Sequence, residues 1–541
     1  MVVLLIGYAA YLGYAKTKES RWLNQARGFL AHAEWADARL TLAEVLHLDS
    51  RNVEATRLMA NLLAGNPAAE LPWRKRVVDL NPGSLKDRVD LAMTAVKAGD
   101  LATATNCLAQ VSAGNRKTAE YQNALGVVDI AQHEPIRAEA AFELAASLDP
   151  TNEVPRLNLA VLQLHSTNQV SVTSARAELN AVATGPDTAL HAQALRELIG
   201  DAAVHRQLNT AYALTRQLVA ETNAAFPDLV MQLDVVQAMK SPRLAGLVAA
   251  AQLEAGTDPG RIQILAEWEM KNESPAQPLG WFQRMPAAVQ TNQPVALLAA
   301  ECRLARNDWA GLDASLRTQY WGPLEFLRHA LRARALFGEQ MPQDKTTEWD
   351  NARQAAGVEL RNLIMLVRLC TEWNWVVERT DLLADILKHH PEAKWAGPML
   401  AHDLAAGGRT RALMTFFQQQ YEQDPANLQA QNNLAMTAML LHATEMSPFE
   451  LARQVYQANP TNISYASTYA YALYQQKQAA EALRVYSAFA PKQLADPQVA
   501  GYYALVLKAN GHAKLAREYF QLAAHAPQLL PEERALFGLA P

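Results

Sequence analysis

Few residues in the chain could take part in metal chemistry. His389 and His390 form an adjacent histidine pair and stand directly before Pro391. Side chains of adjacent helical residues point about 100° apart, so the two imidazoles cannot easily share one ion. A histidine at a helix end can instead interact with the last free carbonyl groups. We therefore predict that this pair caps a helix and that the chain holds no metal.

The other candidates for chemistry also receive structural interpretations. Cys107, Cys302 and Cys370 lie far apart without a CxxC pair, and are predicted to be buried apolar side chains. Glu532 and Glu533 stand at a predicted helix start, where carboxylates complement the helix dipole. The sequence contains no GxxxxGK, GxGxxG, HExxH or GxSxG motif. These observations predict a protein that is not an enzyme and binds no cofactor.

The composition predicts an all-helical chain. Of the 541 residues, 50% are hydrophobic, which is enough to bury a large core, and residues that favour helices dominate. Runs of Val, Ile and Thr with the alternation typical of strands are scarce. The formal net charge of −5 gives no general attraction for nucleic acid, so we expect no nucleic-acid partner.

The strongest pattern in the chain is a repeat near its C-terminus. Six positions recur 34 residues later: Tyr469, Ala470, Leu473, Ala482, Tyr486 and Phe489 become Tyr503, Ala504, Leu507, Ala516, Phe520 and Ala523. Leu434-Ala435 and Leu400-Ala401 continue the pattern backwards in steps of 35 and 34 residues. Such spacing predicts antiparallel helix pairs that must stack, because one pair cannot bury its apolar face alone.

The same period returns near the N-terminus. Steps of 34 residues join Leu91-Ala92, Leu125-Gly126 and Leu159-Ala160. Within one unit, Gly126 and Ala138 are predicted to let two antiparallel helices approach closely, with Phe142 filling the space around them. Ala26 and Ala38 have the same spacing in the first unit.

This first unit has nearly the whole pattern of a known repeat: Trp22, Ala26, Phe29, Ala38, Leu42 and Val45, then Asp49-Ser50-Arg51-Asn52. It resembles the tetratricopeptide repeat family, which commonly has Asp-Pro-x-Asn at that last place. The resemblance is clear over residues 20–185 and 395–526. It implies an all-α fold, an α-solenoid of antiparallel helix pairs, with a concave groove lined by the first helix of each pair. The family's chaperone-tail clamp, which needs Lys and Asn at set positions, is not matched.

Four segments follow from this pattern. Residues 1–19 are a membrane anchor or signal segment, 20–185 an N-terminal repeat block, 186–394 a degenerate helical region, and 395–541 a C-terminal repeat block with a capping helix. The degenerate region keeps apolar residues at helical spacing but loses the small residues. It is predicted to continue the solenoid irregularly, with a separate inserted helical domain as the alternative.

Eight of the eleven tryptophans lie in or beside the degenerate region. Core packing is the predicted role for most of them. Turns at Gly322-Pro323 and Gly397-Pro398 indicate that Trp321 and Trp395 are exposed. An exposed aromatic patch could grip a partner or stack on sugar rings. A carbohydrate-handling or enzyme-associated protein with a cleft in this region is therefore an alternative function.

Residues 2–15 are predicted to contact a membrane. They carry no charge and are followed by Lys16, Lys18 and Arg21, as at the edge of a membrane helix. A helix of this length rises roughly 21 Å against a hydrocarbon core of roughly 30 Å, so a single pass needs snorkelling side chains, a thinner bilayer or further residues upstream. A cleaved signal peptide and a buried first helix are the alternatives. We expect a single-pass anchor in a bacterial inner membrane, as in membrane-anchored bacterial repeat proteins that the layout resembles, with the body on either side.

The candidate groove residues are asparagines. Asn158 and Asn433 each stand directly before the Leu-Ala pair of their unit, and Asn123 and Asn432 stand two positions before such a pair. An Asn amide both donates to and accepts from a peptide backbone, so a row of them could hold an extended chain. A solvated or locally bonded asparagine is the alternative. The predicted function is a non-enzymatic, membrane-associated scaffold for a protein or peptide partner, and a homo-oligomer stacked through solenoid ends is a further alternative.

Overall fold

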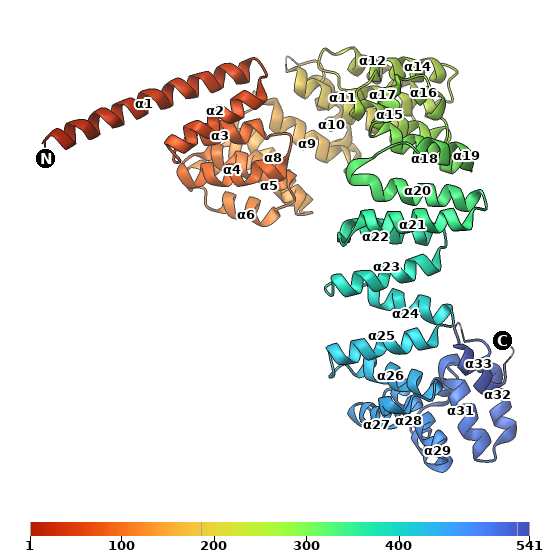
Figure 1. Ribbon diagram of the computed structural model, residues 1–541. Coiled ribbons are helices and arrows are strands. Elements are labelled where there is room, and N and C mark those ends of the chain that lie inside the picture. Colours follow the sequence, from red (N-terminus) through yellow and green to blue (C-terminus); the bar gives the residue numbers. More distant parts are fainter. Residues whose placement is uncertain (1, 186, 527, 540–541) are drawn as a thin grey trace. The chain divides into compact units, whose positions relative to one another are not determined.

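The computed structural model describes residues 2–185, 187–526 and 528–539 of the chain. Over these residues the secondary structure is helical and contains no strand. The chain divides into two compact units, residues 1–290 and 291–541 (Figure 1). The all-helical fold predicted from composition is therefore confirmed.

Unit 1 consists of short helices that follow one another closely. Its helices are α1 (Val2–Ala31), α2 (Trp35–Leu48), α3 (Val53–Leu62), α4 (Pro67–Leu80), α5 (Leu85–Lys97), α6 (Leu101–Ala109), η1 (Asn115–Lys117), α7 (Ala119–Ala131), α8 (Pro135–Leu148), α9 (Glu153–Leu164), α10 (Gln169–Val182), α11 (Thr188–Val204), α12 (Leu208–Ala220), α13 (Phe226–Ala238), α14 (Leu244–Ala255), α15 (Pro259–Asn272), α16 (Leu279–Phe282) and α17 (Ala287–Gln290).

Unit 2 has the same character. Its helices are α18 (Val295–Ala305), α19 (Trp309–Leu316), η2 (Gly322–Leu324), α20 (Glu325–Gly338), α21 (Pro342–Ala356), α22 (Leu360–Glu372), α23 (Val376–His389), α24 (Ala396–Ala406), α25 (Thr410–Gln423), α26 (Leu428–Leu440), η3 (Thr444–Met446), α27 (Pro448–Ala458), α28 (Ile463–Gln475), α29 (Ala479–Tyr486), α30 (Pro491–Leu494), α31 (Pro497–Ala509), α32 (Ala513–Ala523) and α33 (Pro531–Phe537).

Asparagine begins the first helix of several repeat units. The side chains of Asn52, Asn152, Asn427 and Asn462 accept hydrogen bonds from backbone N–H groups in the first turns of α3, α9, α26 and α28. Such a cap satisfies one of the N–H groups that a helix start leaves without a partner. Each of these caps lies at the turn where the repeat pattern places the boundary between two units.

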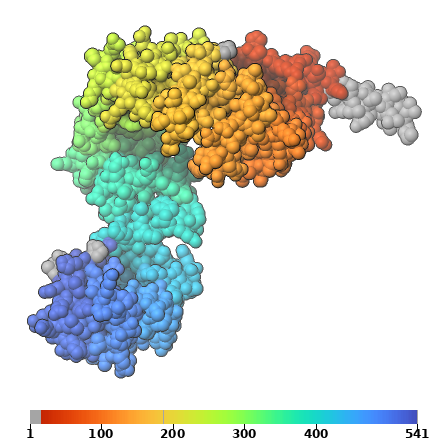
Figure 2. All heavy atoms as spheres, turned by 180° about the vertical axis from the view of Figure 1, so that it is seen from behind, coloured from red at the N-terminus to blue at the C-terminus, as the bar shows by residue number. Residues whose placement is uncertain are grey.

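Successive helices pack in pairs. Figure 2 shows all heavy atoms of the chain from the side opposite to Figure 1. The contact between α7 and α8 requires a glycine. A Cβ atom added to Gly126 would lie 2.5 Å from Cε1 of Phe142, well inside van der Waals contact. The small residue therefore sets how closely these two helices approach, as the repeat pattern predicts.

Helix pairs continue through the degenerate region, including α11 with α12, α20 with α21, and α22 with α23. Here a glycine makes room for a large ring, because a Cβ atom on Gly338 would lie 2.3 Å from Cδ2 of Trp309. The predicted α-solenoid is confirmed for the described residues. The segment boundaries after residues 19, 185 and 394 stay predictions, and the division between the two units falls after residue 290.

Buried ion pairs join neighbouring helices within each unit. In unit 1, Arg196 Nε donates to Asp228 Oδ1 at 2.7 Å and Arg196 Nη2 donates to Asp228 Oδ2 at 2.8 Å. In unit 2, Arg379 donates through Nε and Nη2 to both carboxylate oxygens of Asp403, at 2.7 and 2.6 Å. Because both aspartates are almost fully buried, these two-bond contacts fix the register of α11 against α13 and of α23 against α24.

Helix α1 runs through the segment predicted to contact a membrane. The side chains of residues 2–15 lie outside the described part of the structure, and the predicted membrane contact lies there too. Further along α1, Leu23 and Ala26 are buried in one cluster with Leu42 and Val45 of α2. Among the described residues, no helix has both the length and the apolar content that crossing a membrane requires.

Candidate peptide-binding grooves

The structure brings two of the predicted groove asparagines together. Asn123 on α7 and Asn158 on α9 belong to the first helices of consecutive pairs, and both are half-buried. Asn158 Nδ2 donates to Asn123 Oδ1 at 2.8 Å. Among the described residues, this bond leaves Oδ1 of Asn158 and the N–H groups of Asn123 for a bound chain.

The second pair of predicted groove asparagines has a different environment. On α26, Asn432 is 6% exposed and donates to Asn433 Oδ1 at 3.4 Å, while Gln429 Nε2 donates to the same oxygen at 2.9 Å. The buried Oδ1 atom of Asn432 has no donor among the described residues. Asn433 is thus locally bonded, and this pair has less free amide surface than Asn123 and Asn158.

In the last repeat, the groove face is the face of α31 that carries Tyr502, and residues of the same chain cover it. Tyr502 stands one position before the Tyr-Ala pair of its unit, as Asn433 stands before its Leu-Ala pair. It is 3% exposed, and its O–H donates to Glu533 Oε1 at 2.5 Å. Glu533 also caps α33 by accepting from the Leu530 N–H at 2.8 Å. The sequence predicts only this helix-start role, because no pattern connects Glu533 with Tyr502.

The residues predicted to pack the repeats lie inside the helix pairs. Those that are buried are Ala26, Ala38, Gly126, Ala138, Phe142, Ala470, Ala482, Ala504 and Ala516. Phe520 is half-buried, with its ring centroid 6.3 Å from that of Phe537. The alanines have no side-chain atom beyond Cβ, so neighbouring helices can approach closely at these positions.

The tryptophans of the degenerate region are mostly buried. Those below 9% exposure are Trp268, Trp281, Trp321, Trp349 and Trp375. The exposure predicted for Trp321 is wrong, because its ring lies in the core of unit 2 and Nε1 donates to Gln319 Oε1 at 2.7 Å. The turn at Gly322-Pro323 leads directly into α20 and directs the ring inward rather than outward. Trp395 is 43% exposed, as predicted, although Gly397 and Pro398 lie in the first turn of α24 and form no separate turn.

Two of the carboxylates in this region, those of Asp313 and Glu348, are held by basic side chains. Arg332 donates to Asp313 Oδ1 at 2.7 Å and to Glu348 Oε1 at 2.5 Å. The other oxygen of Glu348 lies 2.6 Å from His329 Nδ1. An acid–base pair for glycoside chemistry instead needs two carboxyl groups kept in different protonation states around a substrate. This network therefore gives no support to the carbohydrate-handling alternative.

Glu269 on α15 is a buried acid of another kind. Its residue is 0% exposed, and Oε1 accepts from Gln252 Nε2 at 2.8 Å, whereas Oε2 has no partner among the described residues. Burial raises the pKa of Glu269 to about 7, although the hydrogen bond from Gln252 acts in the opposite direction. The folded protein therefore retains a proton here over a pH range in which an exposed glutamate has lost it.

The histidine pair lies at the end of α23, as predicted. His389 Nδ1 is 2.9 Å from the Asp385 carbonyl oxygen, and His390 Nε2 is 2.5 Å from the Val358 carbonyl oxygen. The contact of His389 lies within the last turn of α23 and fits the predicted capping role, whereas His390 contacts the connection between α21 and α22. The three cysteines are buried. Within the described ranges, no cluster of His, Cys, Asp and Glu side chains is arranged to hold a metal ion.

The repeat spacing and the stacked helix pairs define a tetratricopeptide-like α-solenoid. No protein-family model matches the chain, and no curated protein matches it. Among solved structures, it is similar to pilF of Pseudomonas aeruginosa, at 16% identity over 41% of this chain and 99% of that one, with a TM-score of 0.31. It is also similar to a tetratricopeptide repeat protein from Parabacteroides merdae, at 10% identity over 54% of this chain and 99% of that one, with a TM-score of 0.30. A third is the Cut9–Hcn1 assembly of the APC/C, at 11% identity, 94% and 97% coverage, and a TM-score of 0.27. The fold assignment rests on the helix pairs of the chain itself.

Proposed function

We propose that this protein is a non-enzymatic scaffold that binds an extended segment of a partner protein on the groove face of α7 and α9. One observation carries the proposal: the hydrogen bond between Asn158 and Asn123, which aligns two side-chain amides on consecutive first helices. Stacked repeats present such positions in a row, so a bound chain can follow them. The amides would contact the backbone of the partner, and binding would depend little on its sequence.

Photo-crosslinking tests this groove. A photoreactive amino acid placed at Leu162, one helical turn after Asn158 on α9, should capture the partner, whereas the same group at Glu143, which is exposed on the second helix α8, should not. Asn123→Ala should lower capture at position 162 several-fold and leave the melting curve unchanged, because Asn123 is only half-buried. Equal capture at both positions, or capture that Asn123→Ala leaves unchanged, would contradict the proposal.

We also propose that residues 2–15 hold the scaffold at a bacterial inner membrane. Their apolar character and the basic residues after them support this association. The full chain should sediment with membranes and resist carbonate extraction, whereas a chain that starts at residue 16 should be recovered in the soluble fraction. Protease treatment of sealed vesicles would then show which side the repeats occupy. Equal extraction of both chains would remove the anchor from the proposal.

A further inference from the structure

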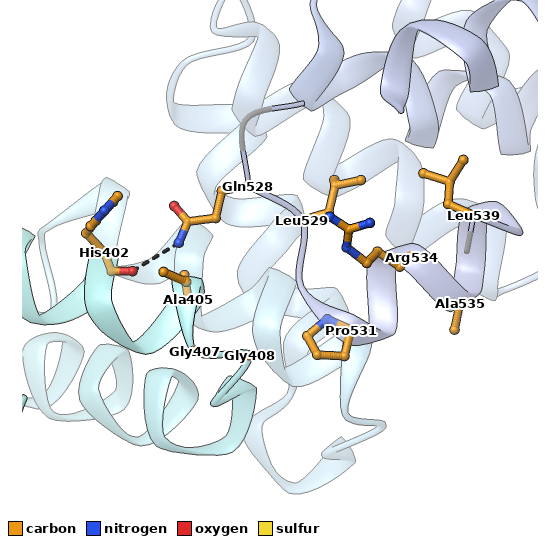
Figure 3. Close-up of a pocket in the computed structure, with 11 residues that line it drawn as sticks. His402, Ala405, Gly407, Gly408, Gln528, Leu529, Pro531, Arg534, Ala535 and Leu539 are labelled. Carbon is orange, nitrogen blue, oxygen red and sulfur yellow. Dashed lines mark hydrogen bonds between the residues drawn. The ribbon is translucent and has the colours of Figure 1, made fainter. Parts of the chain in front are cut away.

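The C-terminal segment, residues 528–539, returns to helices that lie more than a hundred residues earlier in unit 2. Gln528 Nε2 donates to the His402 carbonyl oxygen at 3.0 Å, beside the end of α24 (Figure 3). Thr410 Oγ1, at the start of α25, donates to Glu532 Oε2 at 2.5 Å. The segment therefore spans from the last repeat to the first repeat of the C-terminal block.

The same segment occupies groove positions of the last repeat. The Tyr502 ring meets that of Phe537 at a centroid distance of 5.1 Å, in an edge-to-face arrangement. The Tyr502 O–H also donates to Glu533, four residues before Phe537. One face of α33 thus presents a carboxylate and, one helical turn later, an aromatic ring to the groove.

A slot in the groove receives the ring. Gly501 stands two positions before the Tyr-Ala pair of its unit, where the other groove has Asn123. A Cβ atom on Gly501 would lie 2.4 Å from Cε2 of Phe537. The absence of a side chain at this position is therefore what allows the ring of Phe537 to reach 6% exposure.

The segment borders a cavity and contains only a short helix. A cavity of about 970 Å³ remains between it and the end of α24, bordered by His402, Ala405, Leu529 and Arg534 (Figure 3). Pro531 and Ala535 are exposed, and a helix as short as α33 has little stability of its own. Burial raises the pKa of Glu533, despite the opposing hydrogen bond from Tyr502, because the charged carboxylate is partly desolvated.

We propose that residues 528–539 are a built-in ligand of the groove face of α31, and that this face accepts a partner helix with the same chemistry. That partner would carry a glutamate and, four residues later, a phenylalanine or a similar ring. It would enter when the chain's own segment leaves. The inference rests on the proposed function, since it assumes that grooves of this solenoid bind partners, but it concerns the C-terminal block.

A competing segment of the same chain lowers the apparent affinity for a partner. If only a small fraction of the molecules has an open groove, the measured association constant is the intrinsic one multiplied by that fraction. Phe537→Ala removes the ring that fills the slot and should open the groove. Gly501→Leu should fill the slot and exclude both the chain's own segment and a partner.

The test uses a fluorescent peptide with the sequence of residues 526–541 and full-length protein. Fluorescence anisotropy should show at least about tenfold tighter binding to the Phe537→Ala chain than to the unchanged chain. A peptide with alanine in place of the phenylalanine should not bind. Adding Gly501→Leu to Phe537→Ala should abolish binding. Hydrogen exchange over residues 528–539 should rise in Phe537→Ala, while α24 to α32 keep their protection.

The inference is overturned if the peptide fails to bind a Phe537→Ala chain whose repeats stay protected. It is equally overturned if Gly501→Leu leaves peptide binding intact. Capture at position 162 reports on the other groove. Lost peptide binding with retained capture would refute this inference alone, whereas lost capture with retained peptide binding would refute only the proposed function.

Discussion

Gly126→Ala is the most direct test of the repeat packing. The added Cβ atom would lie 2.5, 2.6 and 2.8 Å from three ring atoms of Phe142, so the ring or one helix must move. Overpacking of this kind costs about 1 to 3 kcal/mol. Alanine also favours a helix over glycine by about 1 kcal/mol. The difference predicts that the free energy of unfolding of the α7–α8 pair falls by up to about 2 kcal/mol.

Two matched variants separate the two effects. Gly200→Ala lies in the middle of α11, where no atom is within 4 Å of the added Cβ, so it should stabilise its helix by up to about 1 kcal/mol. Phe142→Ala removes all three of the closest ring atoms. In that background, Gly126→Ala should become stabilising, as at Gly200.

Native-state hydrogen exchange measures these changes where they occur, because stability in a stacked repeat protein is largely local. Peptides from α7 and α8 report on Gly126, and peptides from α11 report on Gly200. If Gly126→Ala and Gly200→Ala stabilise their helices equally, or if the effect of Gly126→Ala does not depend on Phe142, the close approach of α7 and α8 is refuted.

Three further predictions concern other buried groups. Since burial raises the pKa of Glu269 from 4.5 to about 7, the folded state binds the extra proton across that range. The free energy of unfolding should fall by on the order of 3 kcal/mol as the pH rises from 4.5 to 7, and urea unfolding of Glu269→Gln should lose this slope. Asp403→Asn should lower the free energy of unfolding by about 3 kcal/mol, because Arg379 would lose its carboxylate partner. Glu450→Gln, in an exposed pair with Arg453, should change the free energy of unfolding in urea little. Equal effects of the two variants would contradict the role of burial. Burial raises the pKa of Cys370 to about 12. A thiol reagent at pH 8 should therefore label Cys370 much faster in urea than in the folded protein. Rapid labelling of Cys370 without urea would refute its burial.

Much of the fold could be predicted from the sequence because repeat contacts are close in the chain. Gly126 meets Phe142 from the next helix, and both positions follow from the 34-residue period. Asn152 begins α9 at the turn where the pattern ends one unit and starts the next. In a stacked repeat, each unit contacts mainly its neighbours, so local spacing specifies most of the packing.

Part of the candidate site could also be predicted. Asn123 and Asn158 occupy corresponding faces of consecutive units, and the structure joins them by a hydrogen bond. The difference from Asn433 could not be predicted, because it depends on the rotamer of Gln429, a neighbour that hydrogen-bonds to it. Side-chain partners within one helix turn compete with a ligand for the same amide, and the repeat pattern does not specify which partner is chosen.

The sequence by itself determined the helices, their pairing and the small residues between them, since all of these depend on neighbours within one or two units. Only the tertiary structure decided that Trp321 lies in the core, because a turn signal does not specify the direction in which the chain leaves it. Only the tertiary structure placed Phe537 against Gly501 and Glu532 against Thr410. The contact to Thr410 joins residues 122 positions apart, and whether such a segment returns depends on the path of every repeat between them.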